Sequence, residues 1–367
     1  MSTRINNLKN LFPKNSIDAT LISSPHNILY LTNFSHFYHT EREAFLLITQ
    51  KNQYILTDGR YTDAVKKHIK NFQLLEISPQ NPFENTIKNI IEKEKILSLG
   101  IETNNITVAE HKKIAPLVKN IKHFNLTELR IQKDREEIAA IQQACIIGDK
   151  TFTFILEKIK SGITEKEVAF EMENFIRKND AEISFRTVVA FGKNSAFPHH
   201  KTGKDRLKNN DAILLDFGVK YENYRSDMTR TIFFGKASLE KKRVYATVLN
   251  AQQKAIEYLL SCHSRERGNP DHKIYLSDVD KIARGYIIAQ KFPSFPHSLG
   301  HGIGLKDHEP PSINPKSKEI LKTGMVFSIE PGIYLNNFMG VRIEDLIAIQ
   351  NDTVIQLTHS PKNLIEL

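Results

Sequence analysis

HSLGHGIGLKDHE, residues 297–309, is the stretch that decides the fold of this 367-residue chain. It places His297, His301 and His308 in a segment punctuated by glycines, which permit close backbone approach or unusual φ angles. No strand–loop–helix pattern with a lysine follows, so the glycines do not form a phosphate-binding loop. Imidazoles in such a segment are candidate metal ligands.

Four further stretches each carry one carboxylate in or beside an apolar run, where a charge is otherwise unfavourable. They are AILLDFG (212–218), YRSDMTRTIFF (224–234), MVFSIEPGIY (325–334) and GVRIEDLIAI (340–349). A buried carboxylate is costly unless it is paired or binds a metal. Four converging carboxylates would repel one another, and two divalent cations would balance their charge. The pattern therefore predicts a two-metal site made of Asp216, Asp227, His301, Glu330 and Glu344.

The chemistry of these five side chains indicates which metals suit them. Four carboxylates and one imidazole are mostly hard oxygen donors, which favours Mn²⁺, with Co²⁺, Zn²⁺ or Fe²⁺ as alternatives. Two-metal sites hold their ions about 3.5–4 Å apart and activate a bridging water. Asp216 and Asp227 are eleven residues apart, so a hairpin across 217–226 would bring both carboxylates to one face of a sheet.

In this order, the five stretches resemble the metallopeptidase family of Xaa-Pro aminopeptidases, prolidases and methionine aminopeptidases, whose fold is nicknamed pita bread. The resemblance covers nearly the whole chain, because residues 18–34 and 55–61 look like the extra N-terminal domain of the proline-specific members. It implies an α/β (α+β) architecture. An N-terminal mixed-sheet domain would precede a pita-bread domain with a curved, largely antiparallel sheet.

The resemblance also implies a role for each residue of the site. Asp227 and Glu344 would bridge both metals, Asp216 would complete one metal, and His301 with Glu330 would complete the other. Glu330 would also carry the proton to the leaving nitrogen. The other residues implied are His308 near the tetrahedral intermediate, His297 and His199 on the substrate, and Arg342 with Tyr334 orienting Asp227.

The chain departs from the family pattern at positions that bear on specificity. His200 stands where family members often have glycine, and Asp307 stands where an aliphatic residue is common. The chain contains no tryptophan, so it cannot supply a substrate-capping indole. These departures leave specificity more open than catalysis.

The order of patterns along the chain predicts two domains. Alternating strands and helices over 1–128 form the first, and 129–367 form the catalytic domain. Capping-box pairs predict helices that start after Asp134 and Thr164. We expect residues 261–276, between helices at 239–260 and 278–290, to be an inserted surface loop.

Bulk composition excludes several classes of protein. No signal-peptide h-region and no apolar run long enough to span a membrane are present, so no membrane partner is expected. Two isolated cysteines, Cys145 and Cys262, favour a reducing compartment, and we expect a cytoplasmic location. The net charge of +9 is spread along the chain, which argues against nucleic-acid binding.

The leading functional hypothesis is a dinuclear metal-dependent peptidase that cleaves the N-terminal Xaa-Pro bond of peptides, of the aminopeptidase P type. The alternative is a prolidase, which takes only Xaa-Pro dipeptides. A remote alternative is a non-catalytic binding protein, but such a relative should have lost one of the acids. The resemblance further implies a homodimer.

Overall fold

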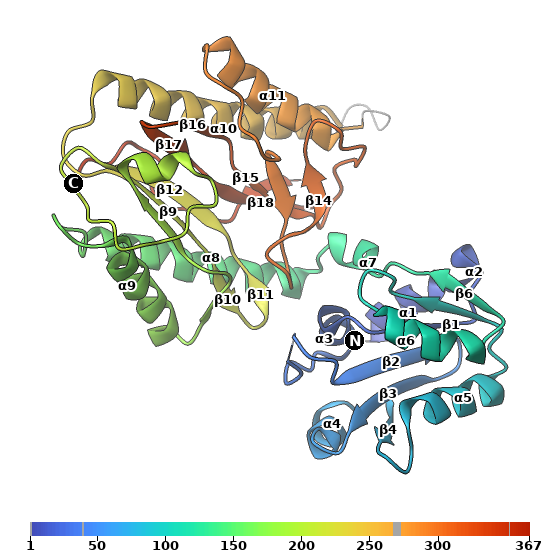
Figure 1. Cartoon of the computed structure of the whole chain (residues 1–367). Coiled ribbons are helices and arrows are strands. Elements are labelled where there is room, and N and C mark those ends of the chain that lie inside the picture. Colours follow the sequence, from blue (N-terminus) through green and yellow to red (C-terminus); the bar gives the residue numbers. More distant parts are fainter. Residues whose placement is uncertain (1, 39, 267–272, 352) are drawn as a thin grey trace. The chain divides into compact units, whose positions relative to one another are not determined.

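The computed structural model describes residues 2–38, 40–266, 273–351 and 353–367. By internal contacts the chain divides into two compact units, Met1–Arg130 and Ile131–Leu367 (Figure 1). The division lies two residues after the expected boundary at Glu128. Among the described residues, no helix has the length and apolarity needed to cross a bilayer.

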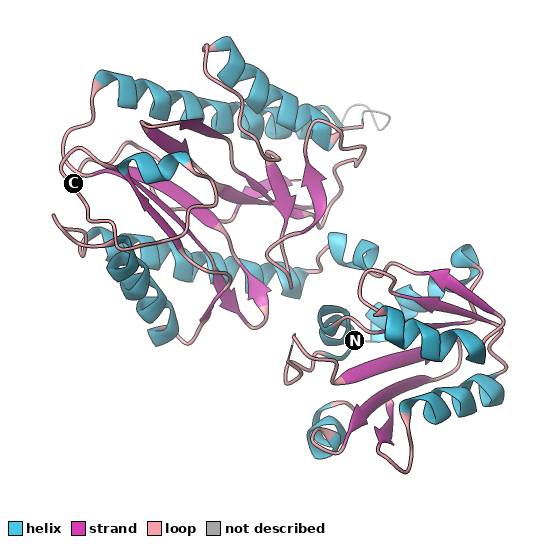
Figure 2. Ribbon diagram, viewed as in Figure 1, coloured by secondary structure: helices cyan, strands magenta, loops and turns pink. Residues whose placement is uncertain are grey.

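The N-terminal unit is built on one mixed six-stranded sheet with the order β4-β3-β2-β1-β5-β6 (Figure 2). Strands β1, β2 and β3 pair antiparallel, while β3–β4, β1–β5 and β5–β6 pair parallel. The AFLLIT run of β2 is buried along its whole length, as expected of a central strand. The strands are β1 (Ala19–Ile22), β2 (Ala44–Thr49), β3 (Gln53–Asp58), β4 (Gln73–Ile77), β5 (Ser98–Ile101) and β6 (Asn120–His123).

Short amphipathic helices bury the apolar side chains of this sheet. The helix Phe83–Glu94 (α5) follows Pro82 and turns Ile87, Ile90 and Ile91 into the core. The other helices are α1 (Ser2–Asn10), α2 (Phe12–Asn15), α3 (Pro25–Thr32), α4 (Thr62–His68), α6 (Val108–Ile114), η1 (Ala115–Leu117) and α7 (Thr127–Ile131).

All paired strands of the C-terminal unit run antiparallel, as expected. Hydrogen bonding divides them into several short sheets, chiefly β12-β9-β8 and β14-β13-β15-β18-β19. The strands are β7 (Glu182–Ile183), β8 (Val188–Phe191), β9 (Ala212–Phe217), β10 (Val219–Tyr221), β11 (Tyr224–Arg225), β12 (Met228–Phe233), β13 (Gly300–Gly302), β14 (Glu309–Ile313), β15 (Val326–Ile329), β16 (Gly332–Leu335), β17 (Met339–Arg342), β18 (Asp345–Gln350) and β19 (Thr353–Gln356).

Helices cover these strands on two sides, as Figures 1 and 2 show. Arg135–Leu156 (α8) and Glu165–Lys178 (α9) share one core with β8, β9 and β12. Leu239–Glu266 (α10) and Leu276–Ala289 (α11) share a second core with the later strands. The capping boxes predicted at Asp134 and Thr164 are both formed. The two cores hold the strands that carry the acidic residues between rigid layers.

The expected inserted loop at 261–276 is partly wrong. Helix α10 continues through Glu266, and α11 begins at Leu276. Between Leu239 and Gly268 the sequence contains no proline or glycine, so no helix breaker ends the helix at Leu260. Residues 267–272 of this segment, including His272, lie outside the described residues.

Candidate metal centre

The pair of strands β9 and β12 brings the first two acids together. Asp216 lies in β9 opposite Thr229 of β12, and Asp227 directly precedes β12. Residues paired across an antiparallel ladder point to the same face. Asp216, Asp227 and Glu344 each offer a carboxylate oxygen within 4.8 Å of the others. The expected convergence of the two aspartates is therefore present.

The remaining ligand candidates come from strand ends far along the chain. His301 lies in β13, Glu330 follows β15, and Glu344 lies between β17 and β18. The Nε2 atom of His301 is 3.3 Å from Oε1 of Glu330 and 3.6 Å from Oδ2 of Asp227. Ligand atoms of His301, Glu330 and Glu344 again lie within 4.8 Å of one another. Glu344 belongs to both groups, as a bridging carboxylate would.

The carboxylates of this cluster have unsatisfied atoms that a cation would satisfy. Oδ1 of Asp227 and Oε1 of Glu344 are buried and accept no hydrogen bond from any residue that the structure describes. Burial, and then the neighbouring carboxylates, raise the pKa of Asp227 and of Glu344 well above their ordinary values. Burial also raises the pKa of Glu330 to about 7. Divalent cations would reverse these shifts by stabilising the charged carboxylates, so the side chains fit a metal centre.

Arg342 orients an acid of the cluster, but its ion pair is with Asp216 and not with the expected Asp227. Its Nη2 donates to Oδ2 of Asp216 at 2.6 Å, its Nη1 to the Tyr334 hydroxyl at 3.0 Å, and its Nε to Oγ1 of Thr229 at 2.9 Å. Thr229 in turn donates to Oε2 of Glu344 at 2.7 Å. Burial disfavours the Arg342 charge, but the surrounding acidic groups hold its pKa well above the ordinary value. One arginine thus connects two candidate ligands.

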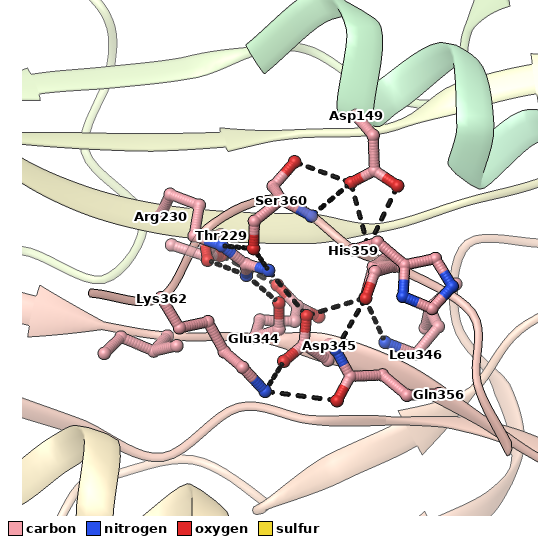
Figure 3. Close-up of polar contacts among 12 residues, drawn as sticks. Asp149, Thr229, Arg230, Glu344, Asp345, Leu346, Gln356, His359, Ser360 and Lys362 are labelled. Carbon is pink, nitrogen blue, oxygen red and sulfur yellow. Dashed lines mark hydrogen bonds and ion pairs between the residues drawn. The ribbon is translucent and has the colours of Figure 1, made fainter. Parts of the chain in front are cut away.

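A buried ion network lies directly behind Glu344 (Figure 3). Arg230 is 1% exposed; it donates to the Glu344 carbonyl at 2.5 Å and to Oδ1 of Asp345 at 2.6 Å. Lys362 donates to the other oxygen of Asp345 at 2.7 Å. Burial alone would raise the pKa of Asp345, but Arg230 and Lys362 hold it below the ordinary value.

The sequence analysis did not find this network. Arg230 and Asp345 are 115 residues apart in the chain, and a buried arginine in DMTRT carries no local signal. Asp149 holds the same region by accepting from the backbone N–H groups of His359 and Ser360 (Figure 3). The backbone of Glu344 is therefore fixed from the side away from the cluster.

All five ligand candidates line a cavity of about 470 Å³, together with His199, His297, His308 and Arg342. Burial lowers the pKa of His297 to about 4, so its imidazole is neutral at pH 7; its Nε2 lies 3.0 Å from the Tyr334 hydroxyl. Burial also lowers the pKa of His308, whose ring centre is 4.0 Å from that of His301. The cavity therefore offers neutral imidazoles around the acidic cluster.

Glu165 anchors the loop that carries His199, and the sequence analysis missed it. The Glu165 side chain is fully buried. Its oxygens accept four hydrogen bonds: from Phe191 N (3.0 Å), Asn194 Nδ2 (2.9 Å), Gly203 N (2.8 Å) and His200 Nε2 (2.8 Å). The unusual His200 was visible in the sequence, but its partner lies 35 residues away.

Comparison with known proteins agrees with this geometry. The model of metallopeptidase family M24 matches residues 139–351, and that of the creatinase/prolidase N-terminal domain matches residues 4–137. The chain belongs to metallopeptidase family M24. Membership makes it a peptidase, and the family implies divalent metal ions, which the acid and histidine groups could bind.

Three solved M24 structures cover essentially the whole chain. An Xaa-Pro dipeptidase from Bacillus anthracis is 31% identical with a TM-score of 0.90, covering 100% of this chain and 99% of that one. A prolidase from Thermococcus sibiricus is 32% identical with a TM-score of 0.89 and the same coverage. An X-Pro aminopeptidase from Thermotoga maritima is 31% identical with a TM-score of 0.85, covering 99% of this chain and 100% of that one. The expected two-domain M24 architecture is confirmed.

Proposed function

We propose that this M24 peptidase is a metal-dependent Xaa-Pro dipeptidase. The observation that carries the proposal is the cluster of buried acids and histidine with unsatisfied oxygens, facing a cavity of about 470 Å³. The substrate class is supported by the likeness to the dipeptidase of Bacillus anthracis and the prolidase of Thermococcus sibiricus. These comparisons favour the alternative over the leading expectation of an aminopeptidase P.

Five residues would hold the metals: Asp216, Asp227, His301, Glu330 and Glu344. Their hard oxygen donors favour two Mn²⁺ ions. Bound divalent cations supply Lewis acidity, which polarises a carbonyl and lowers the pKa of water. Arg342 keeps the carboxylate of Asp216 turned toward the cluster through its 2.6 Å ion pair. This arginine also donates to Tyr334 and Thr229, and these hydrogen bonds hold its side chain in place.

Glu330 is the group that we assign to proton transfer. Its Oε1 accepts from the Ser328 hydroxyl at 3.1 Å and lies beside His301, at the surface of the cavity. A carboxylate in this position can take a proton from the attacking water and return it to the leaving nitrogen. The proline nitrogen, like the leaving nitrogen of any peptide bond, must gain this proton to depart as an amine.

Three histidines would bind the substrate around this centre. His308 and His199 are exposed at the cavity wall, and His297 lies deeper, against Tyr334. A neutral imidazole can donate one hydrogen bond to a carbonyl oxygen that gains negative charge during the reaction. We assign this stabilisation to His308 and substrate contacts to His199 and His297.

Hydrolysis of Ala-Pro and Ala-Pro-Ala by chelator-treated protein, with and without Mn²⁺, tests the function. We expect Mn²⁺-dependent cleavage of Ala-Pro, with the tripeptide cleaved much more slowly. The Asp227→Ala variant should lose metal and activity, whereas Glu182→Gln, which changes an exposed acid of β7, should keep both. Efficient cleavage of the tripeptide would favour aminopeptidase P, the activity named for the Thermotoga structure. Activity in chelated protein would refute the metal-dependent mechanism.

The homodimer and the cytoplasmic location stay predictions. Sedimentation of the purified protein and fractionation of cells would test them.

A further inference from the structure

The cavity of the metal centre is lined by two arginines with different surroundings. Arg342 is buried and donates to Asp216, Tyr334 and Thr229, so its guanidinium is already engaged in hydrogen bonds within the protein. Arg186 is exposed and forms no hydrogen bond or ion pair with any residue in the described ranges 2–38, 40–266, 273–351 and 353–367. The cavity wall thus presents one cation that is free to meet a ligand.

The position of Arg186 is tied to the metal cluster through the sheet. It precedes β8 by two residues, and the first residue of that strand, Val188, pairs with Asp216 of β9. Paired residues share a face, and side chains two residues apart point the same way. Two residues of extended chain span about 7 Å, so Arg186 lies one short step along this wall from the acids.

The wall around Arg186 is apolar. Phe185, Val188 and Pro198 line the same cavity, and such side chains suit the ring of a substrate proline. The segment is held in place because the Thr202 hydroxyl donates to the Thr187 carbonyl at 3.0 Å. Arg186 also lines a second cavity, of about 450 Å³, together with Lys166 and Phe170. Arg186 is therefore shared by the linings of the two cavities.

We propose that Arg186 binds the free C-terminal carboxylate of the substrate and so selects dipeptides. The proposal rests on the proposed dipeptidase function. In an Xaa-Pro dipeptide the carboxylate lies one residue beyond the scissile bond, about 3.5 Å in an extended chain. In a longer peptide a neutral amide occupies that place. Arginine presents a planar fork that matches a carboxylate with two parallel hydrogen bonds, so it would distinguish the two.

The test compares Ala-Pro with Ala-Pro-amide, which differs only at the terminal carboxylate. Steady-state rates are measured for the full-length, Mn²⁺-loaded wild type, Arg186→Gln and Lys166→Gln. Lys166→Gln is the control. Lys166 is an exposed cation that lines the second cavity but not the metal cavity. Arg186 is exposed, so its replacement should leave the fold intact; thermal denaturation checks this.

We expect the wild type to prefer Ala-Pro strongly over the amide. Arg186→Gln should raise KM for Ala-Pro by about 10- to 100-fold with little change in kcat, as for loss of a charge-assisted hydrogen bond. Its activity on the amide should stay the same, so the preference collapses. Lys166→Gln should behave as the wild type.

Two other outcomes would overturn the inference in different ways. If the wild type cleaves Ala-Pro and Arg186→Gln keeps the full preference over the amide, the dipeptidase function stands and Arg186 is not its carboxylate-binding residue. If the wild type cleaves only longer peptides, or neither substrate, the dipeptidase function fails and the assignment of Arg186 fails with it.

Discussion

Replacing Glu330 by glutamine should change how the stability of the chelator-treated protein depends on pH. Burial raises the pKa of Glu330 from 4.5 to about 7, against the opposing charge of Arg342. Between these pH values the folded protein keeps a proton that the unfolded chain has released. The stabilising contribution of Glu330 is therefore complete below about pH 4.5 and is lost as the pH rises through about 7.

The size of this contribution follows from the two pKa values. Their difference, 7 − 4.5 = 2.5, corresponds to about 3 kcal/mol, because each unit of pKa is equivalent to about 1.36 kcal/mol. The Glu330 side chain is 15% exposed, so screening by solvent removes little of this energy. Glutamine resembles the protonated acid in shape and is neutral at every pH. The variant therefore lacks the loss of stability that accompanies deprotonation of Glu330.

The histidines of the cavity have the opposite effect on how the stability of the protein depends on pH. Burial lowers the pKa of His297 to about 4, and it also lowers those of His301 and His308. His297 makes the folded protein more stable as the pH rises from about 4 to about 6.5, and the other two histidines act in the same direction. The total pH dependence of the wild type therefore mixes both effects. The difference in free energy of unfolding between wild type and Glu330→Gln isolates the carboxylate.

Urea denaturation followed by circular dichroism would measure this difference at intervals from pH 4.5 to 8 in the presence of chelator. We expect the free energy of unfolding of the wild type, minus that of Glu330→Gln, to fall by about 3 kcal/mol over this range. Glu182→Gln, on the exposed β7 strand, is the control and should track the wild type. A difference that stays constant or grows with pH would refute the argument.

Three further predictions follow from individual contacts. Arg342→Lys keeps the charge but loses the hydrogen bonds that one guanidinium makes to Asp216, Tyr334 and Thr229. Titration calorimetry should then show an affinity for Mn²⁺ that is lower by about 10- to 100-fold. An unchanged affinity would contradict the orienting role of Arg342. Glu165→Ala leaves buried donors without an acceptor and should lower the free energy of unfolding by about 2–4 kcal/mol in urea, more than His200→Gly does; equal losses would be against the prediction. Asp345→Asn leaves Arg230 buried without its counter-ion and should cost about 3–5 kcal/mol in thermal denaturation, a value that a stable variant would disprove.

The convergence of the acidic residues could be predicted from local patterns. A carboxylate beside a run of aliphatic residues, as at Asp216 and Glu330, is unfavourable unless something binds it, and this argument needs no partner to be known. The helix starts at Asp134 and Thr164 could also be predicted from local sequence, because a capping box is complete within four residues. Both capping boxes are present in the structure.

The same local patterns could not predict which peptides the enzyme prefers. The acids and histidines perform one chemistry in dipeptidases and aminopeptidases, so the motifs favoured neither. The leading expectation of an aminopeptidase P gave way to the dipeptidase when solved structures were compared. Our proposal places the difference at the wall of the cavity that Arg186 and its apolar neighbours line.

By itself, the sequence determined which carboxylates are candidates for binding a cation, because an acid within an apolar run is recognised from its immediate neighbours. Only the tertiary structure decided what holds those side chains in place. Glu344 receives the hydroxyl of Thr229 from 115 residues away, and Glu165 receives His200 from 35 residues away. Arg230 reaches Asp345 across a similar separation. Such bonds depend on how the strands are ordered in space, which no local pattern encodes.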